Sequence, residues 1–459
     1  MCAATVFGGP GPGFAVFGIC LAAALATRAV GDAATILIVF VVTLLLVPAA
    51  LTLAAGGGVA TPATLCGLVA AAFWILGRMP GAATPGVSIG TRLALLAFGA
   101  VVLVSYAMAV LEARVPVEAR GADRGVVVAV ALLGVALLAS EMIPSRARLD
   151  AVLKAALIAG ALVAVVAIVQ FAFSYDVTQY VGIPGFSRLH TGYEAITRRA
   201  GFNRVSGTAL WPIELSAALT MLIPIGLHFV FVTRRLRWVL VTIVITAAVP
   251  LSISRTGVIG LATVALVLFP AWPKEFRRRV AAATLSLVVA VSIAIPGLLT
   301  ALYHLFSKAG KDNSVTAREK DWSVAAAYFD RRPWFGRGLG TFVPSRYRVF
   351  DNQYLLSLVE IGLIGTVAFV IVLFVGIGAA RAVRRSSTNA GDRDLAQALI
   401  ASIAVALVTC VTFDFLSFSL ARGITFLLVG CAGALLRLQR APKSREVEER
   451  ATPVGVSPP

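Results

Sequence analysis

Arginine is the residue type in this sequence with the clearest capacity for chemistry, because several arginines stand beside strongly apolar segments. Arg255, in the sequence SISRTG, lies between two apolar segments that are otherwise free of charge. An ionisable residue so close to a hydrocarbon core is costly and favours a function, although an arginine that reaches from a helix end to lipid headgroups is nearly as common. Guanidinium groups hold phosphate through paired hydrogen bonds. Arg255 is therefore a candidate contact for a phosphate-bearing ligand.

Two long polar segments, 174–206 and 303–350, carry further arginines. Arg199 and Arg204 lie in the first segment, and Arg318 and Arg337 lie in the second. These charges have two explanations, an anionic ligand or a merely solvated loop, and charge alone favours neither.

The second polar segment contains a predicted amphipathic helix. A capping-box pattern at 316–319 precedes Trp322 and Ala325 at helical spacing, and Pro333 ends the pattern. Arg318 stands four residues before Trp322 and seven before Ala325. This spacing places Arg318 on the apolar face of the helix, where a solvated arginine is seldom found.

Asp351 opens the sequence DNQYLLSLVEIG, which begins the next apolar segment. Its plain interpretation is a helix N-cap, and its chemical one is a base that accepts a proton from an attacking hydroxyl. Gln353, Ser357 and Glu360 follow at helical spacing and form a polar stripe. Such a stripe faces protein or a wet cavity rather than lipid.

Glu214 is a second carboxylate in apolar surroundings, just inside the segment that follows GTALWPI. It needs a partner there, and Arg204 is a candidate. A structural salt bridge and a role in the site are equally compatible with this position.

Three glycines, Gly336, Gly338 and Gly340, surround Arg337 in the sequence RRPWFGRGLGTF. Such glycines let backbone amides approach a phosphate, but they also form ordinary turns. The sequence lacks the GK[ST] of a P-loop. Neither the three histidines nor the five cysteines have metal-ligand spacing, so no metal site is expected.

The elements that position these residues are membrane helices. The chain has 59% hydrophobic and 14% charged residues over 459 positions, with a mean hydropathy of +0.91, which excludes an ordinary soluble domain. Long apolar runs without alternation favour helices over a barrel. We therefore predict an all-α polytopic membrane protein of twelve or thirteen spans, with apolar runs at 14–26, 34–53, 62–76, 93–111, 126–143, 151–173, 207–232, 238–251, 257–269, 281–302, 354–379, 396–412 and 424–436.

The net charge of +18 indicates how the chain is oriented in the membrane and does not indicate nucleic-acid binding, because the basic residues fall in short clusters between spans. Basic clusters in alternate connections between spans mark the cytoplasmic side. These clusters lie at 146–154, 234–237, 274–279, 381–385 and 437–445. The long segments 174–206 and 303–350 then face outward. The predicted organisation is a transmembrane domain at 1–440 and a disordered cytoplasmic tail at 441–459.

Several of these sequences together resemble one family. GFNRVSGTALWPIE, SISRTG, DNSVTAREKDW, PWFGRGLGTF and DNQYLLSLVEIGLIG, in this order between about 199 and 364, look like the O-antigen ligase and polymerase superfamily of bacterial membrane glycosyltransferases. The resemblance implies a helical C-type glycosyltransferase fold that uses a polyprenyl-pyrophosphate-linked saccharide without metal, nucleotide or other cofactor. The partners it implies are a glycan or lipid acceptor and the bilayer of the cytoplasmic membrane, with the active site facing outward.

The same resemblance implies roles for individual residues. By motif position, Arg204, Arg255 and Arg318 contact the donor pyrophosphate, Arg337 lies close by, and Asp351 occupies the position of the base. Many members of the family carry histidine where this chain has Asp351. We group Asp351, Arg255 and Arg318 as catalytic, and assign substrate binding to the set Arg204, Arg337, Arg199 and Glu214.

Two alternatives to a ligase remain open. A polymerase of the same superfamily differs only in its acceptor, which the sequence does not identify. A flippase or transporter of lipid-linked sugars would also suit a helical bundle with a basic cavity. Transporters commonly have related halves, and the two long segments are unlike one another.

Overall fold

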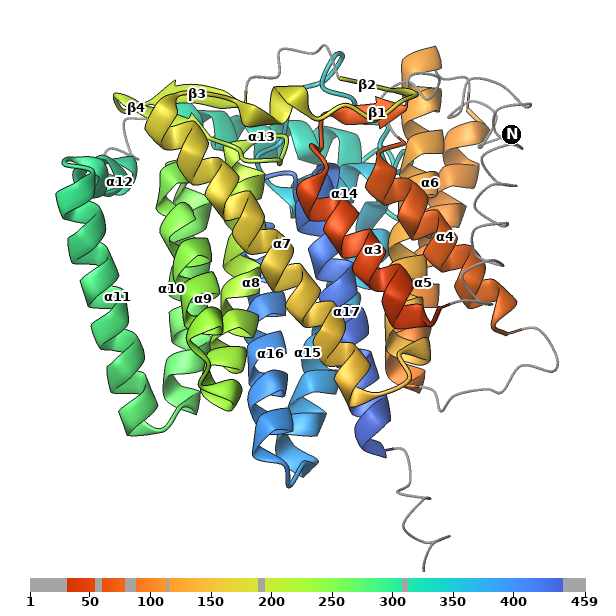
Figure 1. Cartoon of the computed structure of the whole chain (residues 1–459). Coiled ribbons are helices and arrows are strands. Elements are labelled where there is room, and N and C mark those ends of the chain that lie inside the picture. The colour runs from red at the N-terminus through yellow and green to blue at the C-terminus, as the bar shows by residue number, and fades with distance from the viewer. Residues whose placement is uncertain are drawn as a thin grey trace, which may run out of the picture.

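The computed structural model describes residues 31–53, 60–78, 88–112, 115–188, 195–307 and 313–440, with the side chains of 313–320 excluded. Helices make up most of this part of the chain, and two antiparallel two-stranded ribbons complete it (Figure 1). The prediction of a multi-pass helical membrane protein is confirmed. The predicted tail 441–459 and the first apolar run, 14–26, lie outside the described residues.

Six described helices are long and apolar enough to cross a membrane, or seven if the bent pair α11 (Lys274–Ala294) and α12 (Leu298–Ser307) forms one span. The predicted count of twelve or thirteen is not reached, because four apolar helices are shorter than 18 residues and α16 (Ala390–Thr409) has three charged residues near its start. The shorter helices are α3 (Ala33–Leu46), α4 (Pro62–Leu76), α9 (Leu236–Ala248) and α10 (Arg255–Leu268). The six are α5 (Ile89–Val110), α6 (Pro116–Met142), α7 (Arg146–Phe173), α8 (Pro212–Thr233), α15 (Gly362–Ser386) and α17 (Ser419–Arg440).

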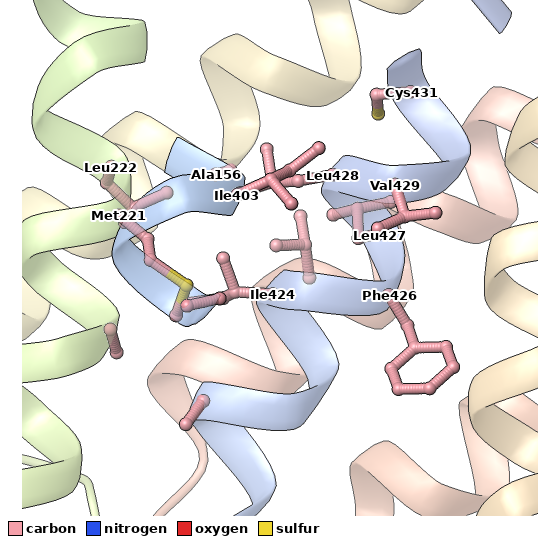
Figure 2. Close-up of a cluster of buried hydrophobic side chains, with 14 of the residues drawn as sticks. Ala156, Met221, Leu222, Ile403, Ile424, Phe426, Leu427, Leu428, Val429 and Cys431 are labelled. Atoms are coloured by element: carbon pink, nitrogen blue, oxygen red, sulfur yellow. The ribbon is translucent and has the colours of Figure 1, made fainter. Parts of the chain in front are cut away.

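Helix α17 is the centre of the bundle. It packs against α6, α8, α15 and α16, and almost all its residues are buried. Figure 2 shows Met221 of α8 on one side of α17, while Phe426 points to the other side. Gly430 allows α6 to approach, since a Cβ at this position would come within 2.6 Å of the Ala136 carbonyl oxygen. Close packing along its length therefore fixes α17 within the bundle.

The polar segments gather at one end of the bundle. Strand β1 (Leu51–Leu53) pairs with β2 (Phe186–Arg188), and β3 (Ile196–Arg199) pairs with β4 (Phe202–Val205). Figure 1 shows these strands, α12 and α13 (Asn313–Phe329) at this end, which we call the strand end. The connections α8–α9, α10–α11 and α15–α16, which carry basic clusters, lie at the opposite end. The two long segments thus share one end, and the short basic connections share the other.

Candidate functional site

The β3–β4 hairpin brings two of the predicted arginines onto one face. Ala200 and Gly201 form its two-residue turn with φ of 51° and 83°, as a type I′ turn requires. Thr197 pairs with Arg204, and Arg199 lies two residues further along the same strand. Because cross-strand partners and residues two apart share a face, Arg199 and Arg204 project to the same side.

The turn before α10 is the meeting point of three arginines. Arg204 Nε donates to the carbonyl oxygen of Ser252 at 2.9 Å, and Arg199 Nη1 donates to that of Ile253 at 3.5 Å. Arg255 follows as the first residue of α10, and its Nε donates to the carbonyl oxygen of Leu305 at 2.6 Å. We call Arg199, Arg204 and Arg255 the arginine cluster.

The electrostatics of the arginine cluster favour an anion. Burial, and then the charge of Arg199, lower the pKa of Arg204 to about 10. These are the signs of guanidinium groups that are desolvated and repel one another, and a bound anion relieves both effects. The N-terminus of α10 adds amide groups and the positive end of its dipole at the same place.

Asp351 is exposed and belongs to the turn before α14 (Gln353–Glu360). The prediction that Asp351 caps this helix is wrong, because Asn352 is the N-cap and accepts from the amides of Tyr354 and Leu355. Burial, and then the negative charges of Asp351 and Glu214, raise the pKa of Asp414 to about 7.

The segment 410–414 joins Asp351 to the arginine cluster. Thr412 Oγ1 lies 2.8 Å from Thr256 Oγ1, and Thr256 directly follows Arg255. The amide of Gln353, two residues after Asp351, donates to the carbonyl oxygen of Cys410 at 2.8 Å. Both groups of predicted residues therefore flank one short segment.

Glu214 does not pair with Arg204 as the sequence suggests. It is fully buried, and its two carboxylate oxygens accept from the amides of Leu210 at 2.8 Å and Leu420 at 2.6 Å. The positive charge of Arg422 acts on it as well. Glu214 thus ties the start of α8 to the start of α17, which is a structural task.

Arg337 lies in a separate cluster. Its Nη2 donates to Glu118 Oε2 at 3.2 Å and to Tyr347 Oη at 2.8 Å, and its guanidinium lies 5.1 Å from the ring centre of Tyr328. The amides of Arg337 and Gly338 donate to α14 carbonyl oxygens at 3.1 and 2.7 Å. These amides are occupied, which favours the turn interpretation of the glycines over a phosphate cradle.

Helix α13 is the helix predicted in the second polar segment, but its start and its apolar face differ from the prediction. It begins at Asn313, ahead of the expected capping box, and it packs against α14. Trp322 is 62% exposed whereas Asp321 and Ala325 are buried, so the predicted apolar face is only partly correct. The side chain of Arg318 lies outside the description. His190 also lies outside it, and His304 is exposed on α12.

The polar stripe on α14 faces protein, as predicted. Gln353, Ser357 and Glu360 are buried. Gln353 donates to Ser357 Oγ at 2.9 Å and accepts from the amide of Leu416 at 2.6 Å, while Glu360 accepts from the amide of Phe342 at 3.1 Å. Gln353 and Glu360 also reach a cavity.

This central cavity has a volume of about 270 Å³ and lies between α6, α17 and the segment 339–360. Its charged and amide lining residues are Arg124, Arg348, Arg422, Gln353, Glu360 and Asp414. None of its three arginines is among the site residues predicted from the sequence. The available signal was a single arginine two residues before an apolar run, which holds for Arg124 before Val126 and Arg422 before Ile424.

Comparison with known proteins finds a match to one protein family. Residues 240–370 match the family model described as O-antigen ligase, and the chain has no match among curated proteins. The matched region contains Arg255, α13 and α14 but not the β3–β4 hairpin. The protein is thus a multi-pass helical membrane protein in which residues 240–370 are similar to the O-antigen ligase family.

Proposed function

We propose that the protein transfers a saccharide from a polyprenyl-pyrophosphate carrier to an acceptor hydroxyl at the outer face of a bacterial cytoplasmic membrane. The observation that carries this proposal is the convergence of Arg199, Arg204 and Arg255 on the turn before α10. Diphosphate is the ligand that such a cluster suits best, because each guanidinium presents a planar fork of donors to phosphate oxygens. The family match supports a lipid-linked glycan as the substrate class.

The reaction follows from these groups. The acceptor hydroxyl attacks the anomeric carbon, the bond from that carbon to the pyrophosphate oxygen breaks, and polyprenyl pyrophosphate leaves with the electron pair. The arginine cluster, with Arg318 of α13, stabilises the charge that grows on the leaving oxygen. Asp351 accepts the hydroxyl proton. In this scheme Arg337 and Glu214 hold the surrounding segments in place through the contacts described above.

An apolar groove beside the arginine cluster suits the carrier chain. It has a volume of about 590 Å³, is lined by residues of α8 to α12, and reaches Ser254, the residue before Arg255. Helix α11, at the edge of the bundle in Figure 1, has no buried residue. A hydrocarbon chain with a diphosphate at one end matches an apolar groove that ends at arginines. We assign this groove to the polyprenyl chain.

The orientation follows from the basic connections. They share the end of the bundle opposite to the strand end, and positive charge in short loops favours the cytoplasm. We therefore place the strand end, with segments 174–206 and 303–350, outside the cytoplasm. The proposed arrangement is a C-type glycosyltransferase domain at 1–440 followed by a cytoplasmic tail at 441–459.

The test is reconstitution of the full chain in liposomes with a polyprenyl-pyrophosphate oligosaccharide and a glycan acceptor. Wild type should release polyprenyl pyrophosphate, whereas Arg255→Ala and Asp351→Asn should release far less. Arg278→Ala, an exposed arginine of α11 on the basic-connection side, is the matched control and should retain activity. Movement of the intact lipid-linked sugar across the bilayer, without release of the carrier, would indicate a transporter instead.

A further inference from the structure

The central cavity is separate from the arginine cluster. None of Arg199, Arg204 and Arg255 lines it. Its walls come from α5, α6, α14, α17 and the segment 339–350. A transferase has two substrates, and the scheme above occupies only the side of the arginine cluster and the groove. The cavity is therefore available for the second substrate.

The three arginines of the cavity differ in how their charge is compensated. Arg348 is paired with Asp321, and Arg422 donates to the carbonyl oxygen of Leu416 at 2.6 Å and lies near the buried Glu214. The side chain of Arg124 has no hydrogen bond or ion pair within the part of the chain that the structure describes. A half-buried guanidinium without a partner is costly, which indicates that a ligand supplies the missing anion.

The carboxyl groups of the cavity do not supply this anion. Burial raises the pKa of both Glu360 and Asp414 to about 7, so neither is a full counter-charge at neutral pH. In protonated form each carboxyl group donates as well as accepts hydrogen bonds, as sugar hydroxyls require. Gln353, Ser417 and Ser419 add further polar groups to the wall. The cavity thus combines excess positive charge with groups that suit a saccharide.

The size and the apolar wall fit a sugar unit rather than a long glycan. About 270 Å³ is near the lower end of the roughly 300–1,000 Å³ that small-molecule sites occupy. Phe98 and Phe426 line the apolar side, and Figure 2 shows Phe426 pointing away from the α8 side of α17. One or two sugar units with an attached phosphate therefore fill the cavity.

The cavity lies close to Asp351 and to the arginine cluster along the chain segment 410–414. Asp414 lines it, and the charge of Asp351 acts on Asp414. Two residues before Asp414, Thr412 contacts Thr256 beside Arg255. The segment 410–414 therefore separates the cavity from the arginine cluster, with Asp351 close to it. In the proposed reaction the acceptor hydroxyl would lie at the edge of the cavity that borders this segment.

We propose that the central cavity binds the acceptor and that Arg124, assisted by Arg422, recognises a phosphate group on the acceptor saccharide. This inference rests on the proposed function, because it assigns the second substrate of that reaction. The phosphate belongs either to a phosphorylated glycolipid or to a second molecule of the lipid-linked donor. Both sources present the same chemistry to the two guanidinium groups.

The experiment uses the full chain in liposomes with saturating donor and two synthetic acceptors. One is an alkyl glycoside with a phosphate monoester on its sugar, and the other is the same glycoside without phosphate. Arg124→Gln should raise KM for the phosphorylated acceptor roughly ten- to hundred-fold, the loss expected for one charged hydrogen bond, and should leave KM for the donor unchanged. Arg124→Lys should recover part of the affinity.

Arg120→Gln is the matched control, since Arg120 is exposed one turn earlier on α6, donates to the Pro116 carbonyl oxygen and does not line the cavity. A third arm contains donor alone. Chains longer than one donor unit, made by wild type and reduced in Arg124→Gln, identify a second donor molecule as the phosphate source. Label on the phosphorylated glycoside identifies the glycolipid class.

The outcomes separate the two proposals. If wild type transfers sugar but Arg124→Gln has the same KM values as wild type, the acceptor assignment is overturned and the proposed function stands. With the phosphorylated glycoside as the acceptor, a rise in KM for the donor and not for the glycoside also overturns it, because the cavity then binds the reacting donor. If wild type releases no carrier with any acceptor, both proposals fall.

Discussion

The hydroxyl oxygens of Thr256 and Thr412 lie 2.8 Å apart, which joins the first turn of α10 to the segment that follows α16. Thr256 follows Arg255 in the chain, and the segment containing Thr412 lies beside Asp351 through the Gln353–Cys410 hydrogen bond. This contact fixes the distance between the proposed leaving-group site and the proposed base. Its loss should misplace the two halves of the site relative to each other.

We predict that Thr256→Val lowers kcat several-fold while the affinity for the donor changes little, because the cluster itself stays intact. Thr256→Ser should restore most of the rate. Thr263→Val is the control, since Thr263 Oγ1 donates only to Ile259 within the same helix at 2.9 Å. Steady-state release of polyprenyl pyrophosphate measures kcat, and equal rates for Thr256→Val and wild type would contradict the prediction.

Arg204→Ala should weaken binding of polyprenyl pyrophosphate by roughly ten- to hundred-fold, because a charged hydrogen bond contributes about 1.5–3 kcal/mol. Arg198 neighbours Arg199 on β3 but pairs with Asn203 and so faces the other side of the hairpin. Arg198→Ala is therefore the matched control and should bind normally. Titration of a fluorescent carrier analogue into nanodisc-embedded protein measures both affinities, and a similar loss in the two variants would refute a specific role for Arg204.

The sequence predicts the parts of this site that depend on local pattern. Hydrophobic periodicity predicts the helices and the polar stripe of Gln353 and Glu360. The pattern of charge predicts that the two long segments lie at the same end of the bundle. Residue contacts between distant elements do not follow from such patterns. In the sequence, Arg124 and Arg422 lie in predicted connections between spans. Only the packing of α6 against α17 brings both residues to one cavity. The partner of Glu214 was missed because backbone amides, which carry no sequence signal, bind it.

The stability of the protein should fall as the pH rises from about 4 to about 7. Burial raises the pKa of Asp414 from 3.8 to about 7, so in this window the folded state holds a proton that the unfolded state has released. The folded state therefore loses its advantage as the pH rises through the window, and the effect is constant above it. Asp414→Asn should flatten this dependence of the unfolding temperature.

The control for the pH experiment is Asp330→Asn, an exposed carboxylate after α13. Glu360→Gln should flatten the curve as well, because burial raises the pKa of Glu360 in the same direction. Thermal unfolding in detergent, followed at several pH values, gives the curves. Parallel curves for Asp414→Asn and wild type would show that Asp414 is ionised in the fold.

A bulky side chain in the apolar groove should select against long carriers. Ala281 of α11 lines the groove, whereas the adjacent Ala282 does not. Ala281→Trp should raise KM for a long polyprenyl donor more than for a short one, since only the long chain extends along α11. Ala282→Trp controls for the tryptophan itself. Equal effects of Ala281→Trp on both donors would place the carrier chain elsewhere.

Arg337 should act on stability rather than on substrate affinity. Its guanidinium lies 5.1 Å from the ring centre of Tyr328 and 5.0 Å from that of Tyr347, and it contacts Glu118, whose side chain is only 6% exposed. Arg337→Ala leaves this carboxylate buried with less compensation, and breaking such a pair costs about 3–5 kcal/mol. We expect a lower unfolding temperature and, for the fraction that stays folded, an unchanged KM for the donor. The double variant Arg337→Met with Glu118→Gln should recover much of the stability, because it removes both charges together. A raised donor KM at normal stability would instead place Arg337 in contact with the substrate.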